Sequence, residues 1–251
     1  MRNIAIILSL LLSIVLHASA QDKTGKGYFR KNNYFDAAVS CGNSQGSASL
    51  AWNHFHLIGK RGKFRFGYGA RFTAYAGHGK EYITAPAKIT SRQTGPQVLF
   101  SETYEESLDT VTFSSPQVNM LNLTINMEYN VYKNFDIGFN IDAAGFSFGD
   151  SRDGSLRSSN RPQSLTATQS AKPTPYNLLL VSDNDIGSLN SELFARYWFN
   201  PKWGVKAGTS FLFTEYKTQN KLLLDNDRFR NKALMLMVGI TYCPFKSQKN
   251  K

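Results

Sequence analysis

The residues of this chain that are best placed to do chemistry are charged side chains at alternate positions of apolar segments. Arg65 and Arg71 are six positions apart, and Glu192 and Arg196 are four positions apart. Side chains separated by an even number of positions share one face of a β-strand. One predicted face therefore carries eight charges of both signs: Arg65, Arg71, Glu128, Asp136, Asp142, Glu192, Arg196 and Lys206. Two interpretations fit, namely an ion-pair network that fills an interior and a polar conduit for small solutes.

Motifs of known catalytic centres are absent from the sequence. There is no GxSxG, HExxH, Walker or CxxC motif, so we predict no enzyme, no catalytic residue, no metal site and no cofactor. His54 and His56 are predicted to be hydrogen-bonded interior residues, since two ligands of one type are weak evidence for a metal site. His78, at the end of a predicted strand, leaves a lipid-modifying enzyme as a remote alternative. A cation at Asp183-Asn184-Asp185 is a weaker interpretation than a turn.

Eight strand-like segments carry this alternation, and they must position the charges. The clearest segment sets Leu121, Leu123 and Ile125 on one face against Asn122, Thr124 and Asn126 on the other. The predicted strands are 33–41, 48–58, 63–76, 117–131, 135–148, 187–199, 203–217 and 231–243. An interior surrounded by eight strands is filled by side chains, which favours the ion-pair network over the conduit.

The connections between these segments alternate between short and long. Three are very short (59–62, 132–134 and 200–202), whereas 77–116 and 149–186 are long. Tight turns on one side and long loops on the other are typical of transmembrane β-barrels. We therefore predict an all-β fold, a closed antiparallel eight-stranded transmembrane β-barrel with short periplasmic turns and long extracellular loops.

Aromatic residues gather near the predicted short turns, as in the interfacial girdles of such barrels. They are Phe64, Tyr129, Tyr132, Phe135, Tyr197, Phe199, Trp203 and Tyr242. A soluble sandwich would also alternate, but the girdle and the bulky inward charges favour the membrane.

The N-terminal segment predicts export. Arg2, the apolar run 4–16 and Ala18-Ser19-Ala20 are typical of a cleaved secretory signal over residues 1–20. The run is too short to span a bilayer as a helix. Residues 21–251 are then one barrel domain, with a periplasmic N-terminal segment over 21–32 and a basic tail over 246–251.

Basic residues concentrate on the predicted periplasmic rim. They are Lys23, Lys26, Arg30, Lys31, Lys60, Arg61, Lys133, Lys202, Lys246, Lys249 and Lys251. This rim is suited to anionic headgroups or a periplasmic cell-wall polymer, and general solubility explains it equally well. Nucleic acid is not a predicted partner, because the compartment is wrong and no basic-aromatic motif occurs.

Taken together, the signal, the alternation and the turn asymmetry resemble the outer-membrane β-barrel family of Gram-negative bacteria. In segments 115–119, 138–142 and 195–198 the chain resembles uncharacterised members of this family. The resemblance implies a location in the cell outer membrane, with its lipids and the assembly machinery as partners. Family members usually end on an aromatic residue, whereas here Phe245 is followed by a basic tail.

The predicted function is a membrane-embedded scaffold that presents extracellular loops to a ligand, with solute passage as the alternative.

Within the loops, the β-prone runs 97–100 and 110–113 are expected to extend strands or form an outer hairpin. The apolar run 178–181 is expected to be partly buried, either as an upward extension of the strand 187–199 or folded over the barrel mouth. Cys41 and Cys243 lie at opposite ends of neighbouring strands, so we predict that both are free thiols.

Overall fold

A computed structural model describes residues 32–59, 62–92, 108–158, 167–180 and 184–244. Over these residues the chain is all-β, with thirteen antiparallel strands in a single sheet and one short helix. Within that part of the chain, none of the helical segments has the length and hydrophobicity needed to cross a membrane. The predicted signal, the basic segment 21–31, Lys60, Arg61, the run 97–100 and the basic tail fall outside the described residues.

The elements follow one another in this order. They are β1 (Asn33–Gly42), β2 (Gln45–Ile58), β3 (Phe64–Gly77), β4 (Lys80–Thr84), α2 (Ala87–Thr90), β5 (Asp109–Phe113), β6 (Gln117–Tyr132), β7 (Phe135–Phe148), β8 (Arg152–Ser158), β9 (Ala167–Pro173), β10 (Tyr176–Leu178), β11 (Leu189–Trp198), β12 (Trp203–Thr218), η4 (Leu223–Asp225) and β13 (Arg228–Tyr242).

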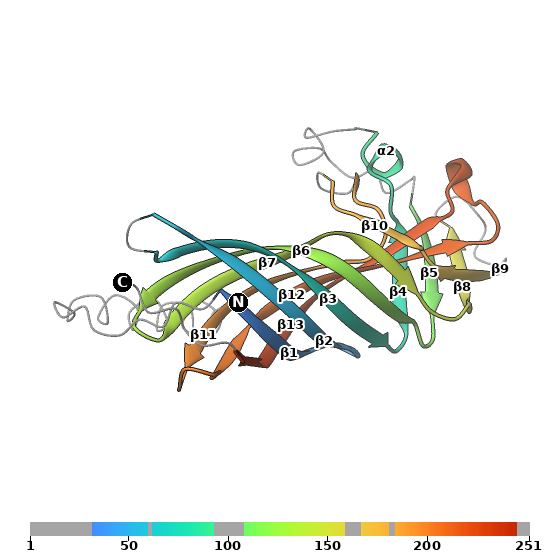
Figure 1. Ribbon diagram of the computed structural model, residues 1–251. Coiled ribbons are helices and arrows are strands. Elements are labelled where there is room, and N and C mark those ends of the chain that lie inside the picture. Colours follow the sequence, from blue (N-terminus) through green and yellow to red (C-terminus); the bar gives the residue numbers. More distant parts are fainter. Residues whose placement is uncertain (1–31, 60–61, 93–107, 159–166, 181–183, 245–251) are drawn as a thin grey trace, which may run out of the picture.

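The long strands form a closed ring. Backbone pairing runs from β1 through β2, β3, β6, β7, β11, β12 and β13 and returns to β1. Closure takes place in the pairs from Phe35↔Tyr242 to Cys41↔Leu236. The C-terminal ends of β2, β6 and β11 lie at one end of this ring, away from β4, β5, β8 and β9 (Figure 1). The predicted closed antiparallel fold is therefore confirmed.

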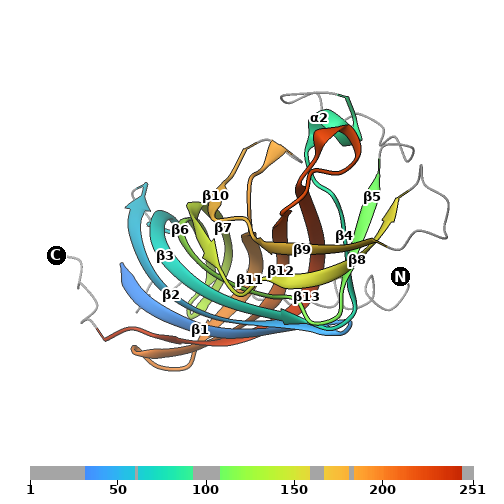
Figure 2. The same cartoon turned by 90° about the vertical axis from the view of Figure 1, so that its right-hand side faces the viewer.

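The described residues contain thirteen strands where eight were predicted, because the long connections form five further strands. Four of these complete a second ring: β13 pairs with β4, which is followed by β5, β8 and β9, and β9 pairs with β12. Figure 2 shows this outer ring, which shares the ends of β12 and β13 with the first. The run 110–113, expected to extend a strand or to form an outer hairpin, belongs to this ring as part of β5 and pairs with β4 and β8.

An apolar core fills the outer ring and continues into the mouth of the first ring. Its centre is formed by Tyr82, Phe113, Tyr216 and Phe229, all with no solvent exposure. The rings of Phe113 and Tyr216 stack with centroids 4.7 Å apart. Burial of this apolar surface stabilises the outer ring, so the segments 80–113 and 152–173 are a folded extension wherever the structure describes them.

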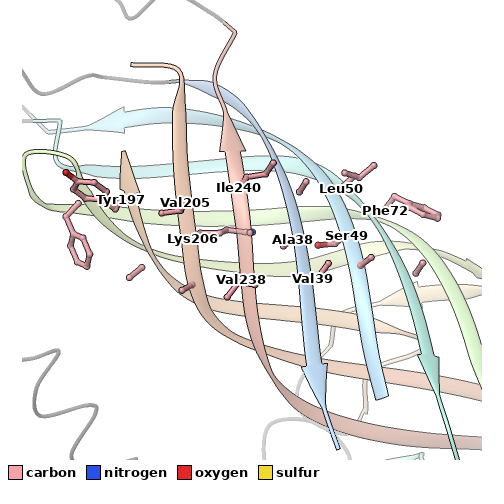
Figure 3. A pocket seen from close by; sticks show the side chains of 17 residues that line it. Ala38, Val39, Ser49, Leu50, Phe72, Tyr197, Val205, Lys206, Val238 and Ile240 are labelled. Carbon is pink, nitrogen blue, oxygen red and sulfur yellow. The ribbon is translucent and has the colours of Figure 1, made fainter. Parts of the chain in front are cut away.

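The two faces of the first ring differ sharply. Outward side chains of β13 are apolar and exposed, with Leu234 at 69% and Leu236 at 75%, whereas the inward face of the ring is polar. On the outer wall, an apolar groove of about 860 Å³ is lined by residues that include Val39, Leu50 and Ile240 (Figure 3). An apolar exterior around a polar interior is the reverse of a soluble sandwich.

His54 and His56 were expected inside, but they follow the outward phase of β2 with Trp52, and their rings lie 4.8 Å apart on the outer wall. Inward residues of β2 are odd-numbered, so the error was one of phase. Cys41 and Cys243 form no disulfide, as predicted, and Cys243 Sγ donates to the carbonyl of Asn33 at 3.1 Å.

The apolar run at 178 is partly buried, in keeping with the prediction. Leu178 belongs to β10, which pairs with residues 144–146 of β7, whereas β11 pairs with residues 135–141 of the same strand, so β10 extends the position of β11 toward the outer end. Leu178 and Leu180 are 43% and 44% exposed, and Leu179 is half-buried. Val181 lies outside the described residues.

Candidate functional site

The interior of the first ring contains a cluster of ion pairs near the short-turn end. Arg65 on β3 contacts Glu128 on β6 at 2.8 Å and Asp136 on β7 at 2.7 Å. Arg196 on β11 contacts Glu128 and also Asp36 on β1, the latter at 3.0 Å. Strand alternation places all five side chains inward, so residues far apart in sequence meet across the interior.

Aromatic side chains frame this cluster and supply further hydrogen bonds. The guanidinium of Arg196 lies 4.4 Å from the ring centroid of Tyr34 and donates to its hydroxyl at 2.7 Å. The Tyr34 hydroxyl in turn donates to Glu128. Trp198 Nε1 donates to Asp136 at 2.8 Å. These neighbours restrict the rotamers of the charged groups and shield them from water.

A second cluster lies nearer the middle of the ring and is linked to the first. Arg71 Nε donates to Asp142 at 3.0 Å, and its Nη1 lies 3.0 Å from Glu192. Lys206 bridges the two clusters, because its Nζ lies 3.0 Å from Glu192 and 3.4 Å from Asp36. The eight residues predicted from the sequence are thus brought into one connected network, which also includes Asp36.

This interior network is nearly neutral and dry. It holds five carboxylates and four basic groups, and each carboxylate contacts at least one basic group. The exposed fraction of every member is 3% or less. A water-filled passage would wet these side chains, so the described interior is closed at this level. Mutual pairing offsets the cost of removing such charges from water.

Sequence reasoning missed Asp36 and a separate buried cluster at the outer end. Asp36 shares the inward phase of β1 with Tyr34, and this alternation could have identified it. At the outer end, Glu215 contacts Arg228 at 2.8 Å and Arg230 at 2.9 Å. No pattern in the sequence marked Glu215, because it breaks the inward phase of β12 and is buried by the segment around Gly187.

The other residues considered for catalysis or metal binding take part in backbone hydrogen bonds. His78 is exposed, and its backbone N–H donates to the carbonyl of Ser44 at 2.9 Å. Asp185 accepts a hydrogen bond from the backbone N–H of Leu180 at 2.6 Å, as in a turn. Among the described residues, no three His, Cys, Asp or Glu side chains are grouped as a metal site would require.

A closed antiparallel sheet with an apolar exterior, a polar interior and short turns at one end is the architecture of outer-membrane β-barrel proteins. No protein-family model matches the chain, and no curated protein sequence matches it significantly.

Solved structures similar to this chain include three outer-membrane proteins. Neisserial surface protein A is 9% identical with a TM-score of 0.37, covering 84% of this chain and 95% of its own. The Yersinia pestis outer membrane protein Ail is 8% identical with a TM-score of 0.33, covering 85% and 99%. A major outer membrane protein from Thermus thermophilus is 10% identical with a TM-score of 0.34, covering 84% and 98%. Similarity at this level carries no functional argument, and the proposals below rest on the chain's own geometry.

Proposed function

We propose that this protein is an integral outer-membrane barrel that does not conduct solutes and that presents a folded extracellular sheet for binding. In this proposal, the ring of β1, β2, β3, β6, β7, β11, β12 and β13 spans the outer membrane as an eight-stranded barrel. The apolar outer wall, which includes exposed Leu234 and Leu236, supports contact with lipid.

The observation that carries this proposal is the outer ring of β4, β5, β8 and β9 with the ends of β12 and β13. Closure of the barrel needs none of those four strands, since β1 and β13 already pair directly. The outer ring nevertheless has a buried core of its own around Tyr82 and Phe113. A rigid element outside the membrane, on a barrel without a wet interior, is suited to recognition.

The dry network supports a scaffold over the alternative of solute passage. Arg65 and Arg196 have no solvent exposure, and the apolar core around Phe229 closes the outer mouth. An interior of eight strands is filled by its side chains. We therefore propose a binding role without catalysis, and we expect no conduction.

Conduction is the sharpest test of this choice. Liposomes that contain the full-length protein should swell no faster in arabinose than liposomes without protein, whereas a general porin reconstituted in parallel should swell rapidly. Swelling at a porin-like rate would contradict the proposal.

Orientation can be tested with single cysteines in two exposed turns. A membrane-impermeant maleimide should label Asn43→Cys on intact cells, because the turn after β1 lies at the proposed extracellular end. Lys202→Cys, in the turn between β11 and β12, should be labelled only after the outer membrane is permeabilised. The parent chain corrects for Cys41, and labelling in the reverse order would refute the proposed orientation.

The outer ring should be dispensable for the barrel. A variant in which residues 80–113 and 150–173 are replaced by short Gly-Ser turns should still show the heat-dependent gel shift of a folded barrel. Failure to fold would mean that these strands serve stability instead of recognition.

A further inference from the structure

Two histidines lie side by side on the outer wall of the first ring, near the end that carries the short turns. His54 and His56 are on the outward face of β2, and Ile58 is the last residue of that strand. Side chains two positions apart on one face of a strand are separated by about 7 Å along the strand. The ring centroids of the two histidines are only 4.8 Å apart, so the rings lean toward each other. Both imidazoles can therefore reach one small ligand.

The spacing of the two rings matches that of two imidazoles bound to one metal ion. Zn–N bonds are about 2.0–2.1 Å long, and the centre of an imidazole ring lies roughly 1.1 Å behind the bonded nitrogen. For N–metal–N angles between about 90° and 110°, the two ring centroids are then roughly 4.5–5.3 Å apart. The observed separation of 4.8 Å falls within this range. The distance between the rings is thus already that of a bidentate site.

A hydrogen bond from β1 prepares His54 for metal binding. His54 Nδ1 lies 2.7 Å from the side-chain oxygen of Asn33. An amide oxygen can only accept, so Nδ1 carries the proton and Nε2 of the neutral ring keeps its lone pair. Metal-binding histidines usually donate their other N–H in this way, which fixes the tautomer and the orientation of the ring. The ring of Tyr68 also lies beside both histidines, with its centroid 5.2 Å from that of His54 and 6.0 Å from that of His56.

We propose that His54 and His56 form a bidentate site for a divalent transition-metal ion such as Cu²⁺ or Zn²⁺, with water in the remaining coordination positions. Imidazole suits these ions, whereas Mg²⁺ and Ca²⁺ prefer oxygen ligands. Over the ranges that the structure describes, no Cys, Asp or Glu joins the pair. The site is therefore open and exchangeable, unlike a closed structural centre with four protein ligands. His56 is exposed, so an ion can enter from solvent.

The inference goes beyond the proposed function and does not depend on it, because both ligands are neighbours on one strand. In the proposed orientation, the end of β2 beside the pair lies on the periplasmic side. A failure of metal binding leaves the predictions of liposome swelling and cysteine labelling unchanged, so the two proposals can be refuted separately.

Titration of Cu²⁺ into the detergent-solubilised full-length protein at neutral pH, followed by tryptophan fluorescence, tests this proposal. Bound Cu²⁺ quenches nearby indoles, and the ring centroid of Trp52 lies 6.3 Å from that of His54. Quenching in the parent should reach half of its final value below about 100 µM Cu²⁺. His54→Ala and His56→Ala should each weaken binding at least about tenfold, since one of two metal–nitrogen bonds is lost.

His78→Ala is the matched control, because this histidine is also exposed but follows β3 at the other end of the ring. It should change the affinity by less than about twofold. An equal affinity in the parent, His54→Ala and His56→Ala would overturn the site, and so would an equal loss in His78→Ala. Half-saturation only at millimolar Cu²⁺ in the parent would also overturn it.

Electron paramagnetic resonance identifies the ligands of the bound Cu²⁺. The parent spectrum should show coupling to two imidazole nitrogens, and His56→Ala should lose one of them. Asn33→Ala should lower the affinity about tenfold and keep the coupling to both nitrogens, because Asn33 positions His54 without touching the ion. A parent spectrum without coupling to two imidazole nitrogens would overturn the assignment of the ligands.

Competition in the parent chain gives a readout that needs no substitution. Zn²⁺ should displace Cu²⁺ and restore the fluorescence, whereas Mg²⁺ at the same concentration should not. Equal displacement by both ions would overturn the proposal, since it would assign the quenching to general binding of cations.

Discussion

Replacement of Arg196 by leucine tests whether the interior network holds the barrel together. The side chain has no solvent exposure and contacts Asp36, Glu128, Tyr34 and Thr241. Its loss leaves five carboxylates facing three basic groups in a dry interior. Removal of one partner from a buried ion pair costs about 3–5 kcal/mol. We expect the free energy of unfolding to fall by an amount in this range and not by more, because Glu128 and Asp36 each keep one other basic neighbour.

The assay is urea unfolding of the protein in lipid vesicles, followed by tryptophan fluorescence. With a slope near 2 kcal/mol per molar urea, the midpoint should fall by about 2 M. Arg157→Leu is the matched control: this arginine is 73% exposed and contacts Glu81 at only 3.7 Å, so its change should stay within about 0.5 kcal/mol. Addition of Glu128→Gln to Arg196→Leu should restore part of the stability, since it removes one excess carboxylate. An unchanged midpoint in Arg196→Leu would refute the reasoning.

Other substitutions probe packing and the outer ring. Gly138→Ala should lower the free energy of unfolding by about 1–3 kcal/mol, because the new methyl would lie 2.4 Å from the ring of Phe194, and a variant as stable as the parent would contradict this packing. Tyr82→Phe should cost about 1 kcal/mol, measured by urea unfolding, since it removes the 2.9 Å hydrogen bond to Thr214. Burial raises the pKa of Tyr82 well above its ordinary value of 10.0, so the unfolded chain loses this proton first as pH rises. Protease resistance of the outer ring should therefore decline above about pH 10, less steeply in Tyr82→Phe, and an equal decline in both would exclude this phenol as the cause.

The long strands could be predicted because every second side chain faces the interior of the ring, so that polar and apolar residues alternate along each strand. In the segment around Leu123 and Asn126, outward and interior positions alternate from Gln117 to Asn130, which is most of β6. The inward charges could be identified for the same reason, since Arg65, Glu128 and Arg196 keep the phase of their strands.

The outer ring could not be predicted in the same way. β4 and β5 have only five residues each, and they pair with each other across a connection of more than twenty residues and with β13 and β8 on their other edges. Short strands are specified mainly by such tertiary contacts. Glu215 is buried by a neighbouring segment and not by its own strand, so local alternation gives it the wrong environment.

The pairing of β1 with β13 has a consequence for the order in which the protein folds. This seam joins residues about two hundred positions apart through seven residue pairs, against fifteen between β12 and β13. Loop-closure entropy makes such a distant pairing late. Asp36 lies on β1, so it contacts Arg196, Lys206 and Thr241 only after β1 has paired with β13. Until then, the basic groups lack one acceptor and β13 keeps an open edge. The seam between β1 and β13 therefore reaches its final register in the same cooperative step in which Asp36 pairs with the basic groups of the interior. A barrel closed with the register shifted by one residue would lack these contacts and is disfavoured.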